Sequence, residues 1–518
     1  MYFKERAHVK LHDAQLQYNL TKIKDKFVEK RRSAITELDD FEGTRNAARE
    51  IRQRALDDLD VWLTIFEENA RARGATVLYA QSPADVNALV LEIARRHDVK
   101  KIIKSKSMVS EESALDHAIE AAGLTVVETD LGEYILQINN YEPPSHIIGP
   151  ALHKSRDEVA DLFHKRHGKP RKEGIDELCL EARAELREHY LTADMGISGG
   201  NFFIAETGSV AIVTNEGNAT LTTTLPKVHV AISGIEKIVP TLEDFATLMR
   251  LLPRSATGQS ISNYVDVLTG TKGPGEFNGA EHMYFILVDS GRSQVLASDV
   301  REALRCIRCG ACMNHCPVYQ NVGGHSYGWV YPGPIGSILT PMYVGLDRAL
   351  DLPQASTMCN QCGVVCPVKI PLPDLQRKLR EHAFERRLRP WYERLGVDHV
   401  PPEREHHAAH PRAGPETSLR ASLMSTAGSD TLVPDARAAA SHESDVSPGD
   451  VAVGVVIGRA SEYFDYFVYG IASVLVFPAI FFPFESPMRA TLLARTMAAG
   501  AARTPSLAAC AADPAAGS

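Results

Sequence analysis

The sequence predicts an α/β domain with a parallel sheet, followed by an α-helical domain rich in cysteine. The α/β class is indicated by short β-rich runs that alternate with helical stretches between residues 74 and 295. The second domain is indicated by the cysteines, because seven of the nine lie between Cys306 and Cys366, with helical sequence on either side. At 518 residues the chain is too long for one small domain, and its length predicts two to four folding units.

The composition is that of an ordinary soluble protein, with 44% hydrophobic and 23% charged residues. A net charge of −9 does not suggest a basic face, so nucleic acid is not an expected partner. Residues Met1 to Arg6 lack the apolar core of a secretory signal, and we therefore expect a cytoplasmic protein. In a reducing compartment, crowded cysteines indicate metal binding rather than disulfides.

Residues 1–73 are predicted to form an N-terminal helical region. Apolar residues recur there at helical steps, as in Leu16, Ile23 and Phe27, and the mixed charges between them suit solvated faces. We expect two or three helices that act as a structural cap.

The α/β domain is expected to span residues 74–295. Helices are predicted at Pro83–His97 and Glu111–Ala122. Strands are predicted at Thr76–Tyr79, Lys101–Ile103, Leu124–Glu128, Phe202–Ala205, Ser209–Val213, Lys227–Ile232 and Met283–Val288. Strand, helix and strand at this spacing indicate βαβ units and hence a parallel sheet.

The cysteine-rich domain, residues 296–395, carries two motifs between expected helices at Asp299–Ile307 and Pro373–Arg387. The first motif is Cys306-Ile-Arg-Cys309-Gly-Ala-Cys312-Met-Asn-His-Cys316-Pro317. Its C-x2-C-x2-C-x3-C-P spacing is typical of ferredoxins, in which the last cysteine ligates the other of two clusters. A second motif is therefore expected, and it is Cys359-Asn-Gln-Cys362-Gly-Val-Val-Cys366-Pro367, with Ser356 where a first cysteine would stand.

Exchanging the last cysteines between the motifs predicts two iron–sulfur clusters, which we expect to be [4Fe-4S]. Cluster 1 is assigned to Cys306, Cys309, Cys312 and Cys366, and cluster 2 to Cys316, Cys359 and Cys362. The fourth ligand of cluster 2 stays open among Ser356, another side chain, water and a partner, and a three-iron cluster is the alternative.

A structural zinc site is the competing interpretation, and it fits poorly because zinc takes four ligands, usually as two separated pairs. The segment between Cys316 and Cys359 is longer than in compact bacterial ferredoxins, which favours an α-helical ferredoxin-type domain. Cys179 and Cys510 lie outside both motifs and are expected to be plain thiols.

A glycine-rich stretch from Gly196 to Ser209 joins a glycine turn to a strand and a second turn, whose backbone amides could hold an anion. Glu206 and the segment Asn215–Asn218 are expected to complete a small polar pocket. The alternative is a tight turn that needs positive φ. Neither a Walker pattern nor G-x-G-x-x-G is present, so a phosphate loop is not indicated. His229, within an apolar strand, is expected to be a core histidine.

The run from about Ala75 to Pro373 resembles the lactate utilization protein B family. The resemblance is carried by Gly199-Gly200-Asn201-Phe202 with Glu206-Thr207-Gly208-Ser209, by Cys306–Pro317 with Gly333-Pro334-Ile335-Gly336, and by Cys359–Pro371. It implies a LUD domain, whose fold is similar to the NagB/RpiA/CoA-transferase group. It also implies the same seven-cysteine pattern, so that Ser356 is a family-like feature.

The resemblance further implies a subunit of a three-protein L-lactate dehydrogenase complex. Its partners would come from the lactate utilization protein A and protein C families, which have a CCG domain and a second LUD domain respectively. Quinone or the respiratory chain would be an indirect acceptor, and the chain would transfer electrons rather than be the whole enzyme. The alternative is a self-contained LUD-domain enzyme acting on a carboxylate or acyl substrate, with Glu206 as its candidate base.

The C-terminal part departs from this family. Residues 396–450 lose all periodicity and are expected to be a disordered linker. Residues 451–518 resemble the first helix of a major-facilitator symporter, with a candidate transmembrane helix at Tyr466–Phe484 through which membrane contact is expected. One span cannot form a transporter. A frameshifted gene junction and a membrane-anchored fusion are the two explanations.

Overall fold

The computed structural model describes residues 2–390. The expected linker at 396–450 and the symporter-like segment at 451–518 lie outside the described residues, as does Cys510. Over the described range, none of the helices combines the length and apolar character needed to span a membrane.

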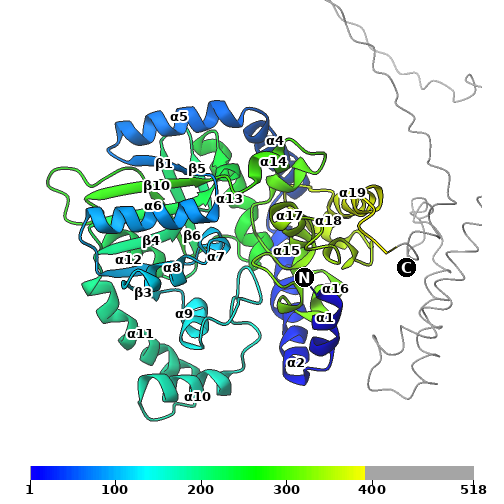
Figure 1. Ribbon diagram of the computed structural model, residues 1–518, viewed down its shortest axis with the longest axis horizontal. Coiled ribbons are helices and arrows are strands. Elements are labelled where there is room, and N and C mark those ends of the chain that lie inside the picture. Colours follow the sequence, from blue (N-terminus) through cyan, green and yellow to red (C-terminus); the bar gives the residue numbers. More distant parts are fainter. Residues whose placement is uncertain (1, 391–518) are drawn as a thin grey trace, which may run out of the picture. The chain divides into compact units, whose positions relative to one another are not determined.

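A parallel sheet of six strands forms the centre of the α/β part (Figure 1), as the sequence predicts. The strand order is β1-β10-β7-β4-β2-β3, and all neighbouring pairs are parallel. The strands are β1 (Thr76–Ala80), β2 (Lys101–Lys104), β3 (Thr125–Glu128), β4 (Met195–Gly199), β7 (Val228–Gly234) and β10 (His282–Val288). The carboxyl ends of these strands therefore share one edge, where α/β folds commonly place their sites.

Strand β4 corrects the expected glycine turn at Gly196. This residue lies inside the sheet, paired with β2 on one side and β7 on the other. A Cβ atom at Gly196 would stand 1.8 Å from the carbonyl oxygen of Thr222, in helix α12 (Asn218–Thr224). Glycine is therefore needed for the close approach of α12 to the strand, and not for a turn.

Helices cover one face of the sheet, where Val86, Val90 and Ile93 pack against the apolar strands. The predicted helix Glu111–Ala122 is divided at Ala114, whose φ is +49°. The helices of this part are α6 (Pro83–Arg96), α7 (Met108–Glu112), α8 (Leu115–Ala121), α9 (Leu131–Ile138), α10 (Arg156–His167), α11 (Ile175–Thr192) and α13 (Leu242–Ala256).

A second, four-stranded sheet lies against the other face. It contains two strands that the sequence predicts but does not assign to a separate sheet. Its order is β8-β5-β6-β9, and β6 is antiparallel to both neighbours. Phe203 of β5 packs on Phe285 of the main sheet and on Phe66, with ring centroids 5.7 and 5.0 Å away. The strands are β5 (Phe202–Ile204), β6 (Ser209–Thr214), β8 (Ile238–Val239) and β9 (Tyr264–Leu268), with η2 (Ile235–Lys237) before β8.

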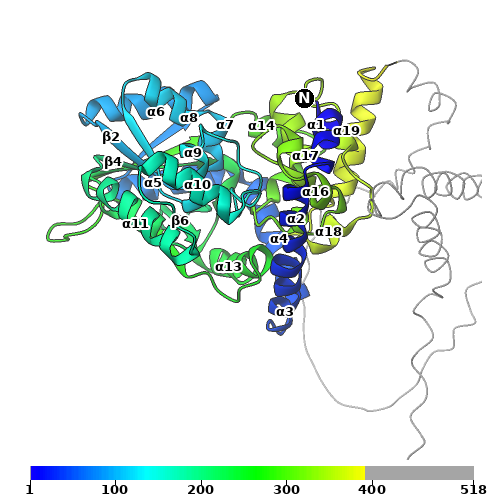
Figure 2. The same ribbon diagram turned by 90° about the horizontal axis from the view of Figure 1, so that it is seen from below.

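The N-terminal region contains more helices than the two or three expected. They are α1 (Phe3–Leu11), α2 (Ala14–Ile23), the π-helical turn η1 (Lys24–Val28), α3 (Glu29–Thr36), α4 (Phe41–Asp57) and α5 (Leu59–Ala72). Helices α1 and α2 lie beside the cysteine-rich helices in both views (Figures 1 and 2), and their apolar side chains share a core with them. The N-terminal helices are thus part of the cysteine-rich unit's packing, beyond a simple cap.

The cysteine-rich part consists of short helices joined by tight turns. The helix expected at Asp299–Ile307 is only a 3₁₀ turn, whereas the helix expected at Pro373–Arg387 is present as α19. The elements are α14 (Arg292–Leu296), η3 (Arg301–Arg305), α15 (Ala311–Asn314), α16 (Pro317–Val322), η4 (His325–Tyr327), α17 (Gly333–Val344), η5 (Leu352–Gln354), α18 (Gln361–Val365) and α19 (Leu372–Glu385).

Candidate metal centre and the adjoining cavity

Four cysteine thiols from both motifs line one small cavity. They are Cys306, Cys309, Cys312 and Cys366. Cys309, Cys312 and Cys366 are buried and Cys306 is partly buried. Apolar side chains such as Ile147, Ile307 and Ile335 complete the wall. The fold therefore brings Cys366 of the second motif to the first three cysteines of the first motif.

The other three cysteines lie in a second group nearer the surface. The thiol of Cys362 has Cys316 and Cys359 as electrostatic neighbours. Cys316 and Cys362 are buried, whereas Cys359 is exposed. Ser356 is partly buried, and its Oγ accepts a hydrogen bond of 3.2 Å from the backbone N–H of Met358. Cys179 is exposed, in helix α11.

The backbone around the thiols provides hydrogen-bond donors that would stabilise negatively charged sulfur. The N–H of Arg308 donates to Cys306 Sγ, and the N–H of Ile370 donates to Cys366 Sγ, both at 3.4 Å. Positive φ at Arg308 and Gly310 makes this tight winding of the chain possible. Amide donors of this kind are among the groups that tune iron–sulfur clusters.

Burial makes these thiols poor acids without a bound cation. Burial, followed by repulsion from Cys366, raises the pKa of Cys309 to about 12. Burial also raises the pKa of Cys316 to about 11. Thiolates concentrated in such a place need a compensating cation, and soft sulfur donors select iron–sulfur clusters or thiophilic metals. The residues present therefore fit an iron–sulfur group.

Arginines from the N-terminal helices hold the second motif, and sequence reasoning missed them. Arg31 donates to the carbonyl oxygen of Val365 at 3.0 Å. Arg45 donates to Cys366 O at 2.7 Å and to Val364 O at 2.8 Å. The available signal was the position of Arg45 and Arg52 on the buried face of α4, among alanine and isoleucine. An arginine on an apolar face needs a buried acceptor.

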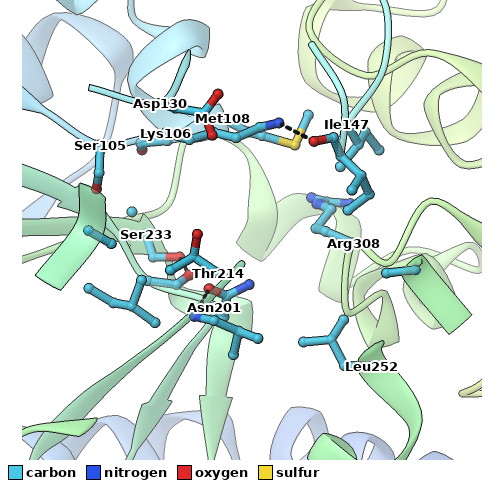
Figure 3. Close-up of a pocket in the computed structure, with 18 of the residues that line it drawn as sticks. Ser105, Lys106, Met108, Asp130, Ile147, Asn201, Thr214, Ser233, Leu252 and Arg308 are labelled. Carbon is cyan, nitrogen blue, oxygen red and sulfur yellow. Dashed lines mark hydrogen bonds between the residues drawn. The ribbon is translucent and has the colours of Figure 1, made fainter. Parts of the chain in front are cut away.

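A cavity of about 330 Å³ adjoins the first thiol group, at the carboxyl edge of the main sheet. It is lined on one side by Gly199, Gly200 and Asn201, which follow β4, and on the other by Ile307 and Arg308 of the first motif. Figure 3 shows Lys106 and Arg308 with Asn201 and Thr214 around the open space. This cavity contains the glycine-rich residues that the sequence indicates for a polar pocket.

Glu206 is not part of that pocket, contrary to expectation. Its carboxylate accepts a hydrogen bond of 2.8 Å from the N–H of Leu242, at the start of α13. It therefore satisfies a free amide of a helix terminus. Asn215, Glu216 and Asn218 do line the cavity. The prediction for the pocket is therefore correct for Asn215, Glu216 and Asn218 and wrong for Glu206, which is not placed to act as a base in it.

The core assignment of His229 is confirmed. Its side chain is buried, and its Nε2 lies 2.8 Å from Ser198 Oγ. The sequence offers no partner for His146 and His153, and the structure supplies both. His146 Nε2 lies 2.8 Å from Asn314 Oδ1, and His153 Nε2 lies 3.0 Å from Glu142 Oε1.

Comparison with known families agrees with both parts of this description. Residues 63–288 match the LUD domain family, and residues 302–370 match the 4Fe-4S dicluster domain family. A protein of known structure, a DUF162 family protein from Deinococcus radiodurans, aligns over 98% of its length with 45% of this chain. Its sequence identity to this chain is 14% and the TM-score is 0.26.

Curated relatives match over most of their length. Lactate utilization protein B of Geobacillus sp. (strain WCH70) is 46% identical over 384 residues, which are 74% of this chain and 81% of that protein. The proteins of the same name from Bacillus licheniformis and Lysinibacillus sphaericus are each 45% identical, over 74% of this chain and 80% of theirs. The expected LUD domain and 4Fe-4S ferredoxin-type domain are confirmed, and the chain belongs to the lactate utilization protein B family.

Proposed function

We propose that this chain is the iron–sulfur electron-transfer subunit of a complex that oxidises L-lactate to pyruvate and passes the electrons towards the respiratory chain. Family membership and the 4Fe-4S dicluster match support this role. The observation that carries it is the arrangement of the thiols. A group of four thiols, three of them buried and one partly buried, adjoins the LUD cavity, and a group of three includes an exposed cysteine.

In this proposal the two thiol groups hold two [4Fe-4S] clusters. Cluster 1 takes Cys306, Cys309, Cys312 and Cys366, and cluster 2 takes Cys316, Cys359 and Cys362. When bound, such clusters supply one-electron transfer. Because Cys359 is exposed, a partner can approach cluster 2. The fourth ligand of this cluster can come from Ser356, another side chain, water or that partner.

The chain's own residues hold the thiols and exclude water from them. Arg31 and Arg45 bind the backbone carbonyls of the second motif, which keeps Cys366 beside the first motif. The N–H groups of Arg308 and Ile370 donate to the Sγ atoms of Cys306 and Cys366, two of the thiols that would hold cluster 1. Protein contributions of this kind, namely burial and hydrogen bonding, set the potential of a cluster.

The proposal also includes the partners, the fold group of the LUD domain, the domain bounds and the location of the protein. The partners are a CCG-domain protein of the lactate utilization protein A family and a LUD-domain protein of the protein C family, with quinone or the respiratory chain as the indirect acceptor. The fold of the LUD domain belongs with the NagB/RpiA/CoA-transferase group. The domains are residues 1–73, 74–295, 296–395, 396–450 and 451–518. The location is the cytoplasm, with membrane contact if residues 451–518 are a membrane-anchored fusion and without it if they are the product of a frameshifted gene junction.

Reconstitution tests the role. The anaerobically purified chain, the CCG-domain protein and the second LUD-domain protein are assayed singly, in pairs and together for reduction of an acceptor dye by L-lactate. We expect reduction only with all three, and loss of activity when Cys362→Ala replaces the wild-type chain. Lactate-dependent reduction by this chain alone would contradict a pure electron-transfer role. It would favour the alternative, a self-contained LUD-domain enzyme acting on a carboxylate or acyl substrate.

A further inference from the structure

Arg308 leaves a donor unused at the wall of the 330 Å³ cavity. Its side chain is 11% exposed, its guanidinium lies over the Tyr331 ring at 4.4 Å from the centroid, and Nη2 donates to Glu236 Oε1 at 3.4 Å. That carboxylate is already engaged by Arg292, whose Nε lies 2.8 Å from Oε2. Arg308 Nη1 is buried without any hydrogen-bond partner. A buried guanidinium with an unused N–H and a shared counter-charge is unusual, because each such donor costs free energy unless it is satisfied.

Lys106 provides a second cation at the same cavity. Its Nζ donates to the carbonyl oxygen of Ile148 at 3.3 Å, as drawn in Figure 3, and lies 3.9 Å from Glu133. Both contacts are long for a charged donor. An anion that enters the cavity therefore meets the Arg308 guanidinium and the Lys106 ammonium, although the carboxylates of Asp130, Glu216 and Glu236 line other parts of the same cavity.

Asn218 provides a hydrogen-bond acceptor at the cavity that has no donor partner in the protein. Its side chain is 8% exposed and lines the cavity, and Oδ1 has no hydrogen-bond partner. An amide oxygen in this position is satisfied by a ligand O–H or N–H. The cavity thus combines unused donors on cationic side chains with one unused neutral acceptor.

We propose that this cavity binds an organic hydroxycarboxylate. The carboxylate lies against Arg308 and Lys106, and a ligand hydroxyl donates to Asn218 Oδ1. A guanidinium suits a carboxylate because its planar fork can donate two parallel hydrogen bonds. The binding site stands on the cavity alone, whereas the choice of L-lactate as the first probe rests on the proposed function.

The bound anion would lie beside the first thiol group. The 330 Å³ cavity shares three lining residues, Ile147, Ile307 and Arg308, with the small cavity of the first thiol group. That group is Cys306, Cys309, Cys312 and Cys366. The two spaces therefore share a wall. A charge placed against Arg308 changes the electrostatic environment of cluster 1, which gives a spectroscopic readout that does not depend on turnover.

Calorimetric titration of the anaerobically purified, cluster-loaded full chain tests the site. The probes are L-lactate, pyruvate and propionate, which share a carboxylate but differ in the hydroxyl. We expect L-lactate to bind most tightly. Arg308→Gln and Lys106→Gln should each raise its Kd about tenfold, since each removes a charged donor. Asn218→Leu should weaken L-lactate and leave propionate unchanged, and exposed Lys165→Gln should change nothing.

One further measurement, EPR spectroscopy of the reduced chain, separates the outcomes. L-Lactate should shift the EPR signal of reduced cluster 1, and in Lys106→Gln the shift should need about tenfold more L-lactate than in the wild-type chain. If Arg308→Gln loses its cluster, Lys106→Gln and Asn218→Leu still decide the question, because both lie outside the cysteine motifs. Absence of binding by all three probes to chain with intact clusters would overturn the inference, and so would L-lactate binding that none of the three variants alters. Either result leaves the electron-transfer role standing.

Discussion

Arg45 in helix α4 donates two hydrogen bonds to the carbonyl oxygen of Cys366, at 2.7 Å from Nη2 and 3.1 Å from Nε. The same guanidinium donates to Val364 O at 2.8 Å. A side chain from the N-terminal region therefore holds the cysteine that the second motif contributes to the first thiol group.

Replacing this arginine should loosen the second motif. We expect Arg45→Met to lower the free energy of unfolding by about 2–3 kcal/mol, because buried carbonyl groups lose a charged donor. Cluster loss to an iron chelator, followed by visible absorbance under anaerobic conditions, should become faster. Arg32→Met is the control, since Arg32 lies on the neighbouring helix α3 with its side chain 72% exposed. Equal rates for the two variants would contradict the supporting role of Arg45.

The cysteine assignment predicts a clear difference between two thiols. Cys309→Ala should remove about four irons per chain, because a [4Fe-4S] cluster depends on its cysteine ligands. Exposed Cys179→Ala should leave the iron content unchanged. Iron analysis of both variants against the wild type measures this. Loss of iron in Cys179→Ala would show that the ligand set is wrong.

The glycine in strand β4 should not tolerate a methyl group. In Gly196→Ala the new Cβ would meet the carbonyl oxygen of Thr222 at 1.8 Å, so strand or helix α12 must shift. We expect a loss of at least about 2 kcal/mol in the free energy of unfolding. Gly149→Ala is the matched control, because the nearest atom to its Cβ would be 3.9 Å away. Chemical denaturation of both variants measures the difference, and similar midpoints would contradict the packing described.

His229 should make the LUD domain sensitive to acid. Burial lowers its pKa to about 3, from an ordinary value of 6.5. Between these values the unfolded chain binds a proton that the folded chain does not, so stability decreases as the pH falls below about 6.5. At pH 5 this amounts to about 2 kcal/mol relative to pH 8.

The variant His229→Gln should abolish that part of the pH dependence while keeping a partner for Ser198. Denaturation midpoints at pH 8 and pH 5 give the comparison, and exposed His164→Gln serves as the control. If His229→Gln lost as much stability on acidification as the wild type, another group would be responsible.

The sequence predicted the features that local pattern controls. Alternating β-rich and helical runs predicted seven of the described strands with nearly correct bounds, but strand β4 was hidden because Gly196 and Gly199 have a turn-like composition. The division into two sheets was not predictable either, since alternation shows which residues are buried but not the sheet to which a strand belongs.

The sequence predicted only those site residues that lie close together in the chain and form a recognisable motif. Cysteine spacing indicated both motifs. The contacts of Arg45 with Cys366, and the shared cavity of Lys106, Asn218 and Arg308, join residues far apart in the chain. The prediction that Glu206 lies in the pocket was wrong for a related reason. Glu206 is close in sequence to the glycine-rich residues of the pocket, but its carboxylate binds the N–H of Leu242 at the start of helix α13.

The most direct test of the central claim is the iron and acid-labile sulfide content of the anaerobically purified full chain, combined with EPR. Two [4Fe-4S] clusters predict about eight irons and eight sulfides per chain, and about seven irons would assign a three-iron cluster to the second thiol group. Colourless protein that contains zinc in place of iron and sulfide would contradict the account.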